Sequence, residues 1–87
     1  MDFDARIGTY TFKPWSPLWG YLPQINEWGR GQVQWHVARV GGPDHVPQFQ
    51  AVPIWYGQPL VQYTCWGYTK KAAKESAARA MALSGHC

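Results

Sequence analysis

The segment from Lys70 to Leu83 constrains the fold most, because it contains six alanines and neither glycine nor proline. Alanine has the highest intrinsic helix propensity, so this composition predicts one long helix. Thr69 can accept a backbone hydrogen bond as the N-cap residue, and Gly85 favours the left-handed turn that ends a helix. Apolar residues at helical spacing give this helix a small face that can lie close against a sheet. They are Ala73, Ala77, Ala80 and Met81.

Three strands are predicted before that helix. From Val33 to Val37, apolar residues alternate with others, which is typical of a half-buried strand, and the Gly-Gly-Pro run at 41 to 43 ends it. Residues 49 to 56 and 60 to 66 form the second and third strands, with a Gly-Gln-Pro turn between them. Connections this short favour antiparallel neighbours.

A short helix is expected before the strands, from Leu22 or Pro23 to Trp28. Proline suits the first helical turn, Gly29 suits the position after the last turn, and Leu22, Ile25 and Trp28 share one face. The resulting order predicts an α+β fold of the α-β-β-β-α type. Its three-stranded antiparallel sheet would carry both helices on one face.

The length of 87 residues allows one domain with one modest core. Residues 1 to 21 are rich in aromatic residues and proline, and we interpret them as an extended arm with a short strand near Ile7 to Phe12. Residues 22 to 87 form the folded domain. Two cysteines are too few for a disulfide scaffold, and neither a signal peptide nor a membrane-spanning apolar run is apparent, so an intracellular protein without membrane contact is expected.

The basic residues are unevenly distributed along the chain. The formal net charge is +3, yet residues 1 to 68 carry four basic and four acidic residues, so the whole excess lies in residues 69 to 87. Lys70 and Lys71 occupy the first turn of the predicted helix, where the positive end of the helix dipole disfavours each by about 0.3 to 1 kcal/mol. With Lys74 one turn further on, three ammonium groups converge on one side. This pattern favours a phosphate partner.

The alternative for the same segment is a solvated helix face, in which Glu75 supports Lys71 and Arg79 through ion pairs along the helix. An excess of positive charge at one helix start favours the polyanion partner over this alternative.

Three segments match one known pattern in order and spacing. Residues 25 to 28 read Ile-Asn-Glu-Trp, residues 42 to 49 read Gly-Pro-Asp-His-Val-Pro-Gln-Phe, and residues 69 to 74 read Thr-Lys-Lys-Ala-Ala-Lys, followed by Ala77-Ala78. Over about residues 22 to 84 the chain thus resembles the double-stranded-RNA-binding domains, whose first helix, first loop and second helix carry these signatures.

The resemblance implies that first-helix polar residues touch one RNA minor groove, that loop residues touch the next, and that the lysines bind the phosphates across the major groove between them. A-form RNA displays 2′-hydroxyl groups in a shallow minor groove and hides its base edges in a deep major groove, which agrees with this division. The implied RNA-binding residues are Asn26, Glu27, Pro43, His45, Lys70, Lys71 and Lys74.

The sequence departs from the family pattern at several places. The stretch from Glu27 to Gly42 is several residues shorter than usual, and Gly29 is expected to end the first helix early, close to the first minor-groove contact. Pro53 lies in the strand that the family places at the centre of the sheet, where a missing N–H predicts a bulge or local break. The aromatic arm has no counterpart in the family pattern.

The leading functional hypothesis is therefore sequence-independent binding of double-stranded RNA without catalysis. The alternative is a domain of the same fold used for protein association, with a protein partner or a homodimer held through the arm or the sheet face. An enzyme is not expected, because paired acids, a catalytic triad and a cofactor motif are not apparent. Cys65, His86 and Cys87 would need His36 or His45 to complete a zinc site and lack paired Cys-x-x-Cys spacing, so a strand cysteine and a frayed terminus are preferred, with no metal.

Overall fold

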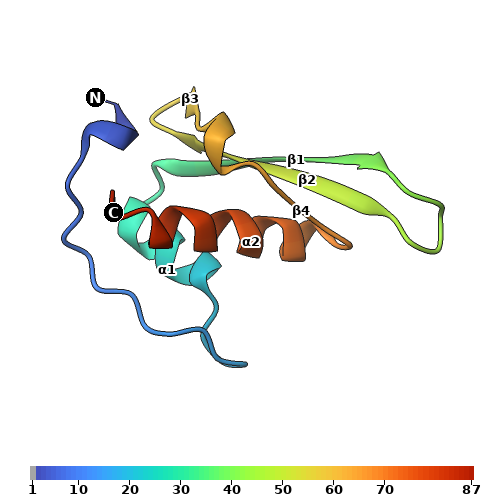
Figure 1. Cartoon of the computed structure of the whole chain (residues 1–87), viewed down its shortest axis with the longest axis horizontal. Coiled ribbons are helices and arrows are strands. Elements are labelled where there is room, and N and C mark those ends of the chain that lie inside the picture. Colours follow the sequence, from blue (N-terminus) through green and yellow to red (C-terminus); the bar gives the residue numbers. More distant parts are fainter. Residues whose placement is uncertain (1) are drawn as a thin grey trace.

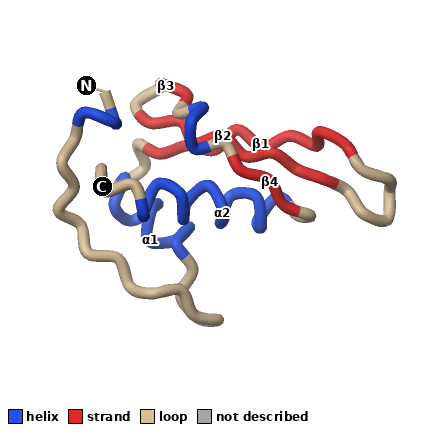
Figure 2. Tube along the Cα trace, viewed as in Figure 1, coloured by secondary structure: helices blue, strands red, loops and turns tan. Residues whose placement is uncertain are grey.

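The computed structural model describes residues 2 to 87 as an α+β fold in which two helices cover one face of an antiparallel sheet (Figures 1 and 2). The predicted order of helix, three strand segments and helix is confirmed, with the third strand divided in two. Among residues 2 to 87, no helix is both long and apolar enough to cross a membrane. The elements are η1 (Phe3–Ala5), α1 (Tyr21–Gly29), β1 (Val33–Gly41), β2 (Gln48–Trp55), β3 (Gln58–Pro59), η2 (Val61–Tyr63), β4 (Cys65–Gly67) and α2 (Lys70–Leu83).

The strand β2 is the centre of the sheet. It pairs along its whole length with β1, from Val33 opposite Trp55 to Gly41 opposite Gln48, and the register shifts once between Arg39 and Gly41. On its other side it pairs with β3 at one end and with β4 at the other. The β1–β2 hairpin extends well beyond the start of α2 (Figure 1).

The prediction of one continuous third strand is wrong. Pro53 pairs with Trp35 of β1 without a bulge, but its carbonyl accepts the N–H of Leu60 at 2.8 Å on the opposite side. In a strand, the N–H and C=O of one residue point to the same side, so the N–H that proline lacks is missing from the third-strand side. The chain forms the short 3₁₀ helix η2 there, with Leu60 buried, and resumes pairing at Cys65. The local break expected at Pro53 therefore occurs in the neighbouring third strand and not in β2 itself.

The first helix ends one residue later than predicted. Gly29 is still helical, and Arg30 rather than Gly29 adopts the left-handed conformation, with φ 48°. A Cβ at residue 29 would lie 2.5 Å from Cγ2 of Val33, so glycine is needed there for the close approach of α1 to β1. The shared face is as predicted: Ile25 is fully buried, and Leu22 and Trp28 pack beside it.

The second helix has the predicted bounds and cap. The hydroxyl of Thr69 accepts the N–H of Ala72 at 3.0 Å, and Gly85 has a φ of +83° just after the last turn. Ala73 and Ala77 form a buried cluster with Ala51 of β2, so the alanine face lies close against the sheet as expected. The third buried alanine of this helix is Ala78, which is fully buried. Ala80, predicted on the apolar face, is half-buried.

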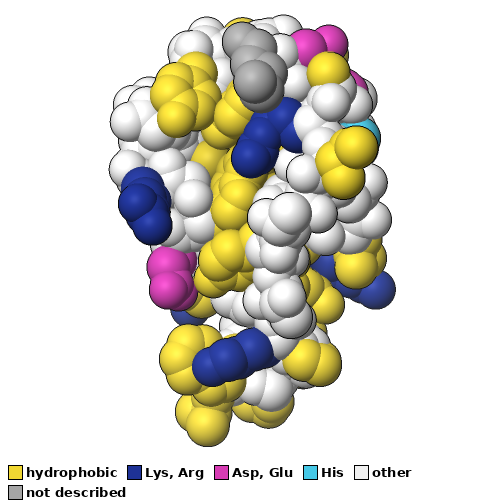
Figure 3. All heavy atoms as spheres, turned by 90° about the vertical axis from the view of Figure 1, so that its left-hand side faces the viewer, with side chains coloured by type: hydrophobic (Ala, Val, Ile, Leu, Met, Phe, Trp, Pro, Cys, Tyr) yellow, Lys and Arg dark blue, Asp and Glu magenta, His cyan; other side chains and the backbone are white. Residues whose placement is uncertain are grey.

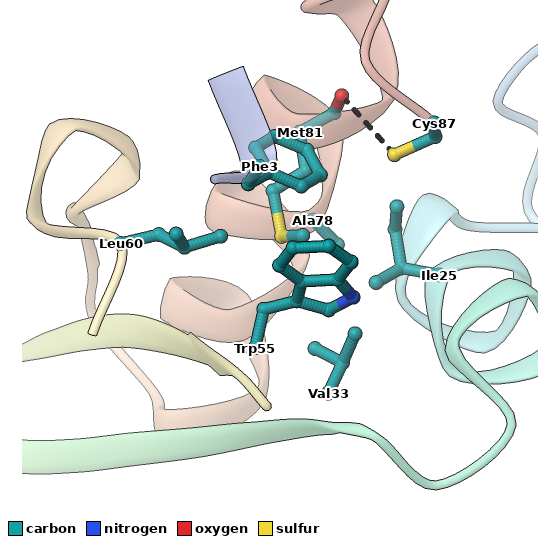
Figure 4. Close-up of a cluster of buried hydrophobic side chains, with 8 residues drawn as sticks. All are labelled: Phe3, Ile25, Val33, Trp55, Leu60, Ala78, Met81 and Cys87. Atoms are coloured by element: carbon teal, nitrogen blue, oxygen red, sulfur yellow. Dashed lines mark hydrogen bonds between the residues drawn. The ribbon is translucent and has the colours of Figure 1, made fainter. Parts of the chain in front are cut away.

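The larger core cluster joins both helices, the sheet and the arm (Figure 4). Phe3 of η1 is fully buried and makes edge contacts with Trp28, Trp55 and Tyr63. The strand expected near Ile7 to Phe12 does not form. The arm instead follows the end of the chain, where Gly8 donates its N–H to the carbonyl of Gly85 at 2.8 Å. The cluster consists of Phe3, Ile25, Val33, Trp55, Leu60, Ala78, Met81 and Cys87.

Candidate nucleic-acid interface

The first turns of α2 carry the three lysines of the predicted phosphate site. Lys70 and Lys71 are exposed and Lys74 is half-buried. All three side chains extend from the N-terminal end of α2. The first N–H groups of a helix have no partner within the helix and add to its capacity for anions. None of the three lysines forms an ion pair with a carboxylate among residues 2 to 87. Their charge is therefore available to an external anion.

Glu75 has a different partner from the one that the solvated-face alternative requires. Its carboxylate accepts the backbone N–H groups of Tyr21 at 2.8 Å and Leu22 at 3.2 Å, at the start of α1. The N-cap residue of α1, Gly20, has no side chain that could accept these bonds. A Cβ at Gly20 would overlap the Glu75 carboxylate, so this glycine makes room for a cap supplied by the other helix. Glu75 thereby fixes α1 beside the lysine end of α2.

Asn26 and Glu27 are both exposed on α1. The side-chain oxygen of Asn26 accepts the indole N–H of Trp35 in β1 at 3.1 Å. Because an indole N–H can only donate, this contact orients the amide and leaves the Asn26 NH₂ group as a donor toward solvent. Glu27 keeps its carboxylate as an acceptor, which suits the hydrogen of a 2′-hydroxyl.

Pro43 and His45 are exposed in the loop between β1 and β2. Arg39 holds the loop: its guanidinium donates to the carbonyl of Gly42 at 3.1 Å and lies 3.4 Å from the carboxylate of Asp44. Gly42 has a φ of +83°, a conformation that favours glycine. The loop is therefore ordered by its own contacts at the tip of the hairpin.

The structure brings two of the predicted regions into direct proximity. Asn26 of α1 and Lys71 of α2 line one hollow of about 600 Å³, together with Thr69 and Glu75. The remaining predicted residues, Glu27, Pro43, His45, Lys70 and Lys74, do not line this hollow. The hairpin tip with Pro43 and His45 lies beyond the lysine end of α2 (Figure 1).

No family model, curated protein or solved structure matches this chain. Three lysines that form no ion pair with residues 2 to 87, beside an exposed amide and a projecting loop, can bind a polyanion by its backbone and offer hydrogen bonds to adjacent hydroxyl groups.

The sequence prediction missed a contribution from the arm to this face. Residues 15 to 19, which we call the arm turn, line the hollow of Asn26 and Lys71 through Trp15, Ser16, Pro17 and Leu18. Proline and aromatic residues in the arm indicated an extended segment, but no local signal indicates which part of the domain it reaches.

The residues considered for a zinc site do not come together within residues 2 to 87. Among residues 2 to 87, no group of three or more His, Cys, Asp and Glu side chains is placed to hold a metal ion. The frayed terminus expected at residues 86 and 87 is wrong: Cys87 is buried, and the ring of His86 contacts the carbonyl of Arg6 at 2.7 Å. Burial raises the pKa of the Cys87 thiol to about 12 and also raises the pKa of Cys65, so neither thiol is activated as a nucleophile.

Proposed function

We propose that this chain binds double-stranded RNA by its shape and backbone, largely without regard to base sequence and without catalysis. The observation that carries the proposal is the shared hollow of Asn26 and Lys71, which joins a hydrogen-bond donor on α1 to the lysine end of α2. Within the described part of the chain, these lysines form no ion pair. The proposed contact residues are Asn26, Glu27, Pro43, His45, Lys70, Lys71 and Lys74.

The chemistry of this face fits duplex RNA better than duplex DNA. The lysines supply the phosphate attraction that any nucleic acid would feel. Asn26 and Glu27 offer one donor and one acceptor that can pair with 2′-hydroxyl groups, which A-form RNA presents in its minor groove and B-form DNA lacks. A loop with an exposed proline and histidine at the far end of the hairpin suits a second, separate contact with the next minor groove.

One observation favours a second candidate function, self-association through the outer face of the sheet. Trp66 of β4 pairs with Gln50, next to the buried Ala51, so the alternation of the strand directs Trp66 away from the helices. Its side chain is 52% exposed. Val61 of η2, shortly before β4 in the sequence, is also exposed. This face is separate from the lysines, so RNA binding and association are compatible.

The test is a set of titrations with blunt duplex RNA, duplex DNA of equal length and single-stranded RNA, each at two salt concentrations. Duplexes of about 16 base pairs match the span of one such domain. The expected result is preference for duplex RNA over both other ligands, with affinity that falls as salt rises. Equal affinity for duplex RNA and duplex DNA would reduce the lysine end to a general basic patch. A molecular mass that increases with protein concentration, together with no affinity for RNA, would favour the association function.

A further inference from the structure

The arm turn is held in a fixed conformation and is not a free loop. Ser16 and Trp19 exchange two backbone hydrogen bonds, at 2.9 and 3.1 Å, and the hydroxyl of Ser16 also accepts the N–H of Trp19. Just before the turn, the buried amide of Gln24 accepts the N–H of Lys13 at 2.7 Å and donates to the Lys13 carbonyl at 3.1 Å. The turn is thus anchored to α1, the helix that carries Asn26.

Large apolar side chains on this turn are exposed to solvent. The exposed fractions are 59% for Trp15, 88% for Leu18 and 49% for Trp19. In Figure 1 the turn projects from the side of the molecule opposite the sheet, and Figure 3 shows hydrophobic side chains gathered with basic ones at that end. An exposed group of apolar side chains in a fixed turn is typical of a contact surface.

The charges around the turn are mostly positive. The ammonium of Lys13 lies 4.5 Å from the ring centre of Trp19, Lys71 lines the hollow that Trp15 shares, and Arg79 lines a second hollow with Trp15. Of residues 2 to 87, Glu75 is the one carboxylate at both hollows, and it already accepts two N–H groups from α1. Indole rings with a cationic rim complement a nucleic-acid strand, whose bases stack and whose phosphates are anionic.

We propose that the arm turn is a second RNA-contacting element, whose indole rings stack on an unpaired base adjacent to the bound duplex. This inference rests on the duplex-RNA binding proposed above and adds a preference among RNAs. A base inside a duplex has both faces covered by its neighbours, whereas an unpaired base in a loop or an overhang can offer a free face to Trp15 or Trp19. Lys13 and Lys71 then bind the phosphates that flank this base.

The experiment compares a blunt duplex, the same stem closed by a four-nucleotide loop, and the loop sequence as single-stranded RNA. The wild-type chain is expected to bind the hairpin about fivefold or more tightly than the blunt duplex, since stacking of a base on an aromatic ring contributes at least that factor. The double variant Trp15→Ala/Trp19→Ala is expected to bind both RNAs with the affinity of the blunt duplex. The variant Trp15→Phe/Trp19→Phe retains aromatic rings and should recover part of the difference.

A matched control is Tyr56→Asn, which removes an exposed aromatic side chain from the β2–β3 turn. Tyr56 is 67% exposed with a φ of 49°, a conformation that asparagine tolerates. This control should keep the full preference for the hairpin, and melting curves should show that all variants fold.

Equal affinity of the wild type for hairpin and blunt duplex would overturn the base contact while leaving duplex binding intact. A preference that survives in the alanine variant would also overturn it, because some other surface would then contact the loop. Loss of self-association in the alanine variant, with both RNA affinities unchanged, would assign the turn to a protein contact. Absence of binding to all three RNAs would overturn both this inference and the proposed function.

Discussion

The carboxylate of Glu75 in α2 accepts the backbone N–H of Tyr21, the first residue of α1, at 2.8 Å. Its other oxygen accepts the N–H of Leu22, so one side chain satisfies two of the N–H groups that α1 leaves without partners. Glu75 is one residue from Lys74 in sequence and therefore links the position of α1 to the lysine end of α2. This contact explains how a nine-residue helix with a glycine N-cap keeps its place.

Replacing Glu75 by alanine should lower the free energy of unfolding by about 1 to 2 kcal/mol, as for the loss of a helix cap. Glu75→Gln keeps an oxygen acceptor and loses the charge at the positive end of the α1 dipole, which costs about 0.3 to 1 kcal/mol. Denaturant unfolding measures both. The control is Ser76→Ala at the neighbouring exposed position, and an equal stability of Glu75→Ala and this control would show that the cap is without energetic effect.

Replacing Lys70, Lys71 and Lys74 together by alanine should weaken duplex-RNA binding strongly and flatten its salt dependence. Each lost phosphate contact removes somewhat less than one unit from the slope of log affinity against log salt. The fold should survive, because removing Lys70 and Lys71 relieves their repulsion by the helix dipole. Arg30→Asn serves as the control, since Arg30 follows the other helix, and asparagine tolerates its left-handed conformation. An unchanged slope in the folded triple variant would contradict the phosphate site.

Replacing Phe3 by alanine should destabilise the domain by about 3 to 5 kcal/mol, because a fully buried ring is removed from the core. A chain of 87 residues has a total stability of about 4 to 13 kcal/mol, so this loss would be a large part of it. Phe3→Leu provides a milder variant for measurement by denaturant unfolding. Ile7→Ala removes an arm side chain that is 92% exposed and should change little. Similar effects at both positions would mean that the arm does not pack as described.

Ionisation of the Tyr63 phenol should lower the free energy of unfolding between about pH 10 and pH 12. Burial, followed by hydrogen-bond donation to Asp4 at 2.7 Å, raises the pKa of this phenol from 10.0 to about 12. The fold favours the protonated phenol, so its contribution is complete below pH 10 and is lost as the pH rises toward 12. The unfolding free energies of the wild type and Tyr63→Phe, measured from pH 7 to pH 11.5, should therefore converge as the pH rises. Parallel curves would contradict the raised pKa.

Local signals in the sequence predicted α2 well and the third strand poorly. Thr69, the alanine run and Gly85 all act within one or two helical turns, so each could be interpreted without the rest of the chain. The division of the third strand depends on Pro53, which removes a hydrogen bond from a neighbour rather than from its own strand segment. Phe3 shows no periodicity with its neighbours, and only the packed structure places it in the core.

The candidate site follows the same distinction. The sequence predicts a phosphate site at the lysines that start α2, because they oppose the helix dipole and concentrate the net charge. The shared hollow of Asn26 and Lys71 depends on how α1 packs on α2, and that packing depends on the Glu75 cap and on Gly20. The contacts of Glu75 with Gly20, Tyr21 and Leu22 join residues more than fifty positions apart, beyond the reach of any local pattern.

The alanine cluster of Ala51, Ala73 and Ala77 limits which substitutions this sequence can accept. All three side chains are fully buried between α2 and the sheet, so a larger side chain at any of them would push the first half of the helix outward. The neighbouring Gly67 allows no side chain either, since a Cβ there would lie 2.7 Å from the backbone nitrogen of Ala73. The spacing between the lysines and the hairpin thus depends on side chains buried beneath the surface, and substitution in the interior would alter the outer surface as directly as a change in the lysines themselves.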